Sequence, residues 1–154
     1  MSNWSKIGFA VATAFIVVTP AGASDAFKYV PAKQVAADVA DTSKGPAVKV
    51  YFNHDTFLEE VAARDKTGQV ELHKFWNDYI TPLSGEAKLT VGGTATGMKD
   101  TGQGESRGDS LTGGQTITLH PGDIVTIPAG MLHWIQLAPG AHFRYLVFKT
   151  KEPG

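Results

Sequence analysis

The chain has 154 residues, of which 42% are apolar and 19% charged, values that fit one folded domain and exclude an intrinsically disordered protein. Its 14 Lys and Arg residues are balanced by 15 Asp and Glu residues, so no positive excess attracts a nucleic acid backbone, and we expect no nucleic acid partner. Cysteine is absent. That absence excludes disulfides, thiolate metal sites and a cysteine nucleophile.

Residues 1–23 have the layout of a secretory signal peptide. Lys6 supplies a positive charge, residues 7–18 are uncharged and mostly apolar, and small residues follow Pro20. The apolar run is shorter than the roughly 20 residues of a transmembrane helix, so an uncleaved anchor is the weaker alternative. We therefore expect cleavage near Ala23 and export to the periplasm or the outside of the cell, with no membrane contact of the mature protein.

The next segment, residues 24–47, is expected to be partly helical and partly extended. Val35 and Val39 lie near helical spacing, which predicts a short helix over residues 32–41. Gly45-Pro46 ends this segment. Residues 48–52 alternate as a strand, and residues 55–64 are predicted to form a second short helix.

From Gly68 onward, short strand-like runs alternate with turn residues. The predicted strands cover residues 69–75, 78–83, 87–91, 115–119, 124–127, 133–137 and 143–149. Regularly spaced short strands indicate an all-β sandwich or barrel, which we assign to residues 48–154. A glycine-rich stretch, residues 92–114, interrupts the rhythm and is predicted to be a long loop that is either functional or mobile.

The local context of two histidines distinguishes them from the other three. Glu71 and His73 are two residues apart in a predicted strand, so their side chains point to the same face. Asp78 can reach the same interior if the chain reverses at Trp76-Asn77. His133 begins a strand directly after the rigid turn Pro128-Ala129-Gly130.

Two motifs resemble those of the cupin superfamily. The second motif of that family is matched by Gly122-x5-Pro128-x-Gly130-x2-His133, and the first by Glu71-x-His73-x4-Asp78-x6-Gly85. Glu71 stands where the family has its first histidine, Asp78 where it has a glutamate, and Leu137 where an asparagine often closes the second motif. The resemblance implies an all-β fold, the cupin double-stranded β-helix or jelly-roll barrel, preceded by short N-terminal helical segments. It also implies that the protein is a small exported bacterial cupin that pairs into a homodimer.

The resemblance further implies a divalent metal ion in the barrel, held by Glu71, His73, Asp78 and His133. Two imidazoles with carboxylates suit Fe, Mn or Zn. The alternative is a cupin that has lost its metal and keeps Glu71 and Asp78 as partners of the histidines or of an arginine.

Glu105 and Arg107 lie in the glycine-rich stretch, which in this architecture could fold over the barrel mouth. Arg107 would then offer a planar fork to a substrate carboxylate, and Glu105 would accept a proton, so both are catalytic candidates. The alternative is an ion pair in a solvent-exposed loop, which stabilises a protein little.

Three functions remain open on the sequence. The first is a small metal-dependent enzyme that acts on a small organic molecule by oxygenase, isomerase or lyase chemistry. The second is a non-catalytic cupin module that binds a small molecule or a metal. A purely structural envelope protein is the third and weakest, because such a protein would have no use for a complete second motif.

Overall fold

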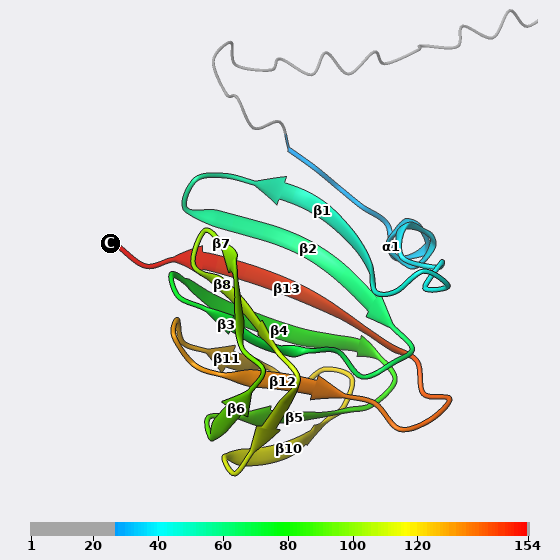
Figure 1. Ribbon diagram of the computed structural model, residues 1–154. Helices are drawn as coiled ribbons and strands as arrows, with labels where there is room; N and C mark the ends of the chain where they lie inside the picture. Colours follow the sequence, from blue (N-terminus) through cyan, green and yellow to red (C-terminus); the bar gives the residue numbers. More distant parts are fainter. Residues whose placement is uncertain (1–26, 154) are drawn as a thin grey trace, which may run out of the picture.

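The computed structural model describes residues 27–153, so the predicted signal peptide lies outside the described part of the chain. Two antiparallel sheets face each other and form a barrel (Figure 1). The first has the strand order β1-β2-β13-β4-β11. Its strands are β1 (Ala47–Asn53), β2 (Phe57–Arg64), β13 (Phe143–Lys151), β4 (Trp76–Ser84) and β11 (Val125–Ile127).

The second sheet has the order β10-β5-β12-β3-β8-β7, and a small separate sheet pairs β6 with β9. The strands of the second sheet are β10 (Gln115–Leu119), β5 (Ala87–Val91), β12 (His133–Gln136), β3 (Val70–His73), β8 (Glu105–Gly108) and β7 (Lys99–Gly102). The small sheet contains β6 (Thr94–Thr96) and β9 (Ser110–Thr112). This arrangement confirms the predicted all-β barrel, and every predicted strand after Gly68 has its counterpart.

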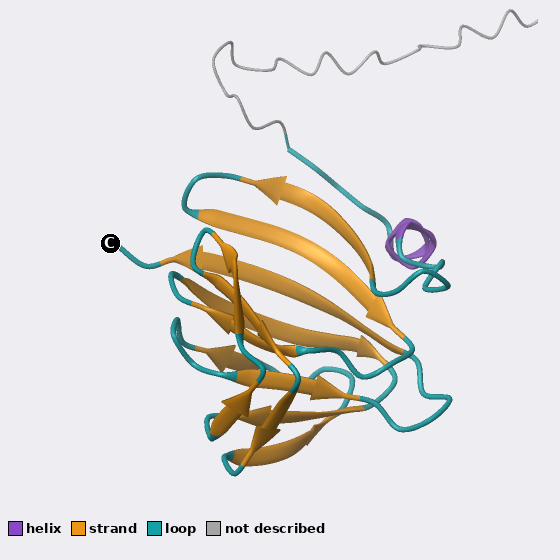
Figure 2. Ribbon diagram, in the orientation of Figure 1, coloured by secondary structure: helices purple, strands orange, loops and turns teal. Residues whose placement is uncertain are grey.

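One short helix, α1 (Ala32–Asp38), lies beside the strands in the described residues (Figure 2). It confirms the helix predicted over residues 32–41, although it ends earlier. Val39, directly after it, is buried with 3% of its surface exposed and anchors this segment against the barrel. No helix among residues 27–153 is long and apolar enough to cross a membrane.

The helix predicted over residues 55–64 is wrong, because this segment is strand β2. Hydrogen bonds to β1 on one side and β13 on the other fix it as an interior strand. Glu60 and Arg64 line the barrel interior, whereas Val61 is fully buried on the opposite face. This two-residue alternation is that of a strand and overrides the weak helical spacing of the segment.

The long loop predicted over residues 92–114 is also wrong in part, because it contains four strands. Gly92-Gly93 and Gly113-Gly114 lie side by side and all four have positive φ, which glycine adopts at little steric cost. These glycines turn the chain into and out of the β6–β9 pair, while β8 continues the larger sheet beside β3.

The barrel is apolar at one end and charged at the other. A cluster of buried residues from both sheets fills the apolar end, including Leu89, Ile135 and Phe143. Along β13 the inward-facing residues change from Phe143, Tyr145 and Val147 to Lys149. The apolar cluster therefore forms the floor of a charged cavity of about 450 Å³.

Replacing Gly85 with alanine should destabilise the fold more than the same change at Gly122. Both glycines have positive φ, 79° and 92°, which costs an alanine about 1–2 kcal/mol. At Gly85 the added Cβ would also overlap the carbonyl oxygen of His142, whereas at Gly122 no atom lies within 4 Å. Urea unfolding of the two variants measures the difference, and equal losses would contradict the packing assigned to Gly85.

Candidate metal centre

Three of the four predicted ligands come from neighbouring strands of one sheet. Glu71 and His73 share a face of β3, as their spacing predicted. His133 opens β12, which pairs with β3 so that His133 lies opposite Glu71. The turn before β12 is fixed by two backbone bonds, from Gly130 N to the His73 carbonyl and from Met131 N to the Pro128 carbonyl.

Asp78 reaches the same interior from the facing sheet. The two residues Lys74-Phe75 separate β3 from β4, and β4 belongs to the first sheet. The chain therefore reverses just before Trp76, close to the point that the sequence suggested. Asp78 is buried, with 4% of its surface exposed.

The ligand atoms of Glu71, His73 and His133 converge within 4.8 Å of one another. Glu71 Oε2 lies 3.4 Å from His73 Nε2 and 3.9 Å from His133 Nε2. Metal–ligand bonds of about 2.1 Å at tetrahedral or octahedral angles place neighbouring ligand atoms about 3.0–3.4 Å apart. The three groups are thus positioned to bind a metal ion once their ligand atoms draw closer together.

Both imidazoles present the same nitrogen to this space. His73 Nδ1 lies 2.6 Å from Glu105 Oε2, and His133 Nδ1 lies 3.1 Å from the Met131 carbonyl oxygen. A carboxylate or carbonyl at Nδ1 holds the proton there and leaves Nε2 for a metal. The three groups therefore suit a divalent ion both in the kind of ligand atom that they present and in how these atoms converge.

The ionisation of these groups is set by burial and by mutual contact. Burial alone would lower the pKa of His73, but hydrogen bonds with Asp78, Glu105 and Glu71 outweigh it and raise the pKa to about 10. Burial lowers the pKa of His133 below its usual value. Glu71 has its pKa lowered, because the bond to His73 and the nearby cations outweigh the effect of burial. The carboxylates around His73 thus stabilise a positive charge at its Nε2, and either a proton or a metal ion can supply that charge.

Lys149 occupies the side of the site that faces Asp78. Its Nζ lies 3.1 Å from Asp78 Oδ1 and 3.1 Å from His73 Nε2. Asp78 Oδ2 lies 3.3 Å from His73 Nε2 and 3.7 Å from His133 Nε2, near enough to join a metal, although the convergent group of three does not include it. Asp78 as fourth ligand therefore stays a prediction, and Lys149 is a cation that the sequence analysis missed.

The glycine-rich stretch is tied to the site by strand pairing. In the β3–β8 pair, Glu105 lies opposite His73 and Arg107 opposite Glu71. Arg107 Nη1 donates to Glu105 Oε2 at 3.1 Å, and both side chains are about three-quarters buried. Glu105 and Arg107 thus form the ion pair that the sequence analysis gave as an alternative, but the pair lies in the cavity wall and not in a solvent-exposed loop. The catalytic roles of Glu105 and Arg107 stay predictions.

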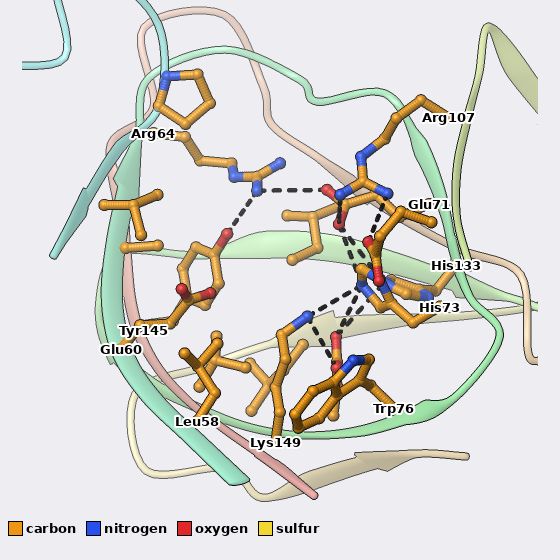
Figure 3. A pocket seen from close by; sticks show the side chains of 18 of the residues that line it. Leu58, Glu60, Arg64, Glu71, His73, Trp76, Arg107, His133, Tyr145 and Lys149 are labelled. Atoms are coloured by element: carbon orange, nitrogen blue, oxygen red, sulfur yellow. Dashed lines mark hydrogen bonds and ion pairs between the residues drawn. The ribbon is translucent and has the colours of Figure 1, made fainter. Parts of the chain in front are cut away.

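Two further charged residues of β2, Glu60 and Arg64, line the cavity and were not among the sequence candidates. Glu60 lies on the wall away from His73 and His133 (Figure 3). Burial raises the pKa of its carboxyl group. Within residues 27–153 its side chain makes no hydrogen bond or ion pair that would hold it in one ionisation state. The signal that could have identified them is strand alternation over residues 57–64, which places residues 60 and 64 on the same face.

Comparisons with solved structures identify the fold. A cupin domain from Schizosaccharomyces pombe is 14% identical with a TM-score of 0.51, covering 70% of this chain, which spans only 61% of that one. A conserved protein with a double-stranded β-helix domain from Klebsiella pneumoniae is 18% identical with a TM-score of 0.55, covering 75% and 85%. A proposed mannose-6-phosphate isomerase from Ralstonia eutropha is 15% identical with a TM-score of 0.56, covering 80% and 97%. No protein-family model matches the sequence, and the search of curated proteins gave no match. The likenesses confirm the cupin double-stranded β-helix that the two motifs implied.

Replacing Glu105 with glutamine should weaken metal binding about ten- to hundredfold, the usual effect of losing a partner behind a histidine ligand. The amide keeps the size of the side chain but removes the charge that orients His73 through Nδ1. Titration of Mn²⁺ or Zn²⁺ by calorimetry measures the change.

Arg107→Ala on the same strand serves as the matched control and should leave the metal content unchanged. Unaltered affinity in Glu105→Gln would show that another group orients His73, and loss of metal in Arg107→Ala would show that Arg107 itself supports the metal site or the fold.

Proposed function

We propose that this chain, which has the cupin fold, binds one divalent metal ion and is a small metal-dependent enzyme acting on a small organic molecule. The observation that carries the proposal is the convergence of Glu71, His73 and His133 on the wall of a cavity of about 450 Å³. That volume lies within the range of small-molecule sites. Charged groups beyond the ligands themselves also line the cavity, and such groups can bind a substrate or move protons.

The ligand set narrows the choice of ion to Fe, Mn or Zn. Two imidazoles and one carboxylate form the set associated with open-site Fe(II), Zn(II) tolerates the same donors, and Mn(II) prefers the oxygens. Such an ion would supply Lewis-acid or oxygen-activating chemistry, which fits an oxygenase, an isomerase or a lyase. The proposed isomerase among the similar structures is in keeping with an enzyme of this fold.

The residues around the ligands divide the remaining tasks. Glu105 orients His73, and its bonds to His73 and Arg107 occupy one of its oxygens. Glu60 is better suited to move a proton, because it faces the cavity and burial raises its pKa toward neutrality. Arg107 would bind a charged group of the substrate, as its guanidinium lines the same cavity.

The second candidate function is a non-catalytic module that binds a small molecule without a metal. The observation that favours it is the ammonium of Lys149, which contacts both His73 and Asp78 and so supplies a positive charge beside the nitrogen that would bind the metal. In that case the cavity is a polar pocket that binds a small molecule through its charged side chains and holds no metal.

Elemental analysis of the protein, purified without chelator or affinity nickel, should find close to one equivalent of Fe, Mn or Zn. His73→Ala and His133→Ala should each lose the metal, because each removes one Nε2 ligand from the convergent group. The loss should exceed the roughly ten- to hundredfold effect of an outer partner.

His120→Ala is the matched control, since His120 lies in an exposed turn and only approaches Glu86 and Asp123. Circular dichroism should show the same strand content in all three variants. Full metal content in both His73→Ala and His133→Ala would place the ion elsewhere, and no metal after reconstitution would favour the second candidate function.

Export with cleavage near Ala23 is a further proposal, which rests on the sequence of residues 1–23 alone. The intact mass of the protein recovered from the periplasm or the medium should equal that of residues 24–154. The full-length mass in the membrane fraction would instead indicate an uncleaved anchor, and the homodimer implied by the resemblance can be measured on the exported protein by light scattering.

A further inference from the structure

Arg64, the last residue of β2, is a buried cation. Only 8% of its surface is exposed, and it lines both the main cavity and a smaller neighbouring one of about 400 Å³. Its guanidinium lies against the backbone of Gly68, where an added Cβ would overlap Nη1. The local sequence thus provides room for this side chain to extend along the cavity wall.

The hydrogen bonds of Arg64 are few for a buried guanidinium, which carries five N–H donors. Nη2 donates to the Tyr145 hydroxyl, and its nearest carboxylate, that of Glu71, lies 3.8 Å away, beyond hydrogen-bond distance. Within residues 27–153 the buried Nε has no partner. A buried charge that is paired so incompletely is costly unless an anion completes its contacts.

Metal binding to Glu71 would leave Arg64 with even less compensating negative charge. Glu71 lies between two guanidiniums, with Arg64 3.8 Å from Oε1 and Arg107 3.8 Å from Oε2 (Figure 3). The cavity lining carries three cations, Arg64, Arg107 and Lys149, against the four carboxylates of Glu60, Glu71, Asp78 and Glu105. A divalent ion on Glu71 therefore leaves the cavity with an excess of positive charge.

We infer that the cavity binds a small organic acid whose carboxylate is held by Arg64 and the Tyr145 hydroxyl, with the rest of the molecule directed toward the metal ligands. The inference rests on the proposed metal-dependent function and names its substrate class. Arg64 offers the planar fork that matches a carboxylate, and a charge-assisted bond in a buried site is among the stronger polar contacts. Arg107, the predicted partner of a charged substrate group, is less available for this carboxylate than Arg64, because Glu105 and the Ser106 carbonyl already accept from its Nη1.

The test is a calorimetric titration of the full chain with L-lactate, with lactamide as its neutral counterpart and with inorganic phosphate. Each probe is added to protein reconstituted with Mn²⁺ and to protein treated with chelator. Lactate should bind at least about tenfold more tightly than lactamide, since only the acid pairs with Arg64. The metal-loaded protein should bind lactate more tightly than the chelator-treated protein.

Arg64→Met should remove the preference for lactate over lactamide while leaving the metal content unchanged. Arg144→Met is the matched control and should keep the preference, because Arg144 bonds to Ser84 and does not line the main cavity. If Arg64→Met does not fold, Arg64→Lys, which keeps the charge and loses the fork, should weaken lactate binding several-fold.

Equal binding of lactate and lactamide, or an undiminished preference in Arg64→Met, would overturn the inference. Phosphate that binds more tightly than lactate and depends on Arg64 would overturn the carboxylate assignment in favour of a phosphate ester. A chain that takes up no metal would overturn the proposed function instead, and the chelator-treated titrations would then decide on Arg64 alone.

Discussion

The charged half of this barrel depends on the compensation of buried carboxylates by nearby cations. Asp78 is buried and the side chain of Glu71 is about three-quarters buried, and burial of an unpaired carboxylate favours its neutral form. Their charge is retained because His73 lies between them, with an arginine beside one and Lys149 beside the other. A metal ion would complete the same balance with a larger and more localised charge.

Strand register places these partners, and it does so through short segments. His133 lies opposite Glu71, His73 opposite Glu105 and Glu71 opposite Arg107, so the three strands β12, β3 and β8 place these side chains on a single wall. The glycine turns that flank β6 and β9 let the chain leave the sheet and return to it in the correct register. Residues far apart in sequence are thereby fixed relative to one another by backbone hydrogen bonds before any ligand is present.

The sequence predicted the barrel and the convergent ligands because both are encoded locally. Glu71 and His73 are separated by one residue in a strand, and His133 follows a turn whose proline and glycine allow little variation. Glu60, Arg64 and Lys149 were missed for a different physical reason. Their inward orientation follows from alternation in β2 and β13, but residues 55–64 carry a spacing that suits a helix nearly as well, and only pairing with β1 and β13 decides between the two. Likewise, nothing local in the glycine-rich stretch shows that Glu105 will pair with β3.

The turn of two residues, Lys74-Phe75, has a consequence for the width of the site. His73 stands on one sheet and Asp78 on the other, yet only four residues lie between them in the chain. The gap across the barrel at this point therefore has an upper limit set by the length of this connection, which cannot grow as side chains repack. Elsewhere the sheets can spread or approach as residues of the apolar floor change in volume. At the ligand end the short connection keeps them within this limit, so changes in the floor would alter the depth of the cavity more than the distance between His73 and Asp78.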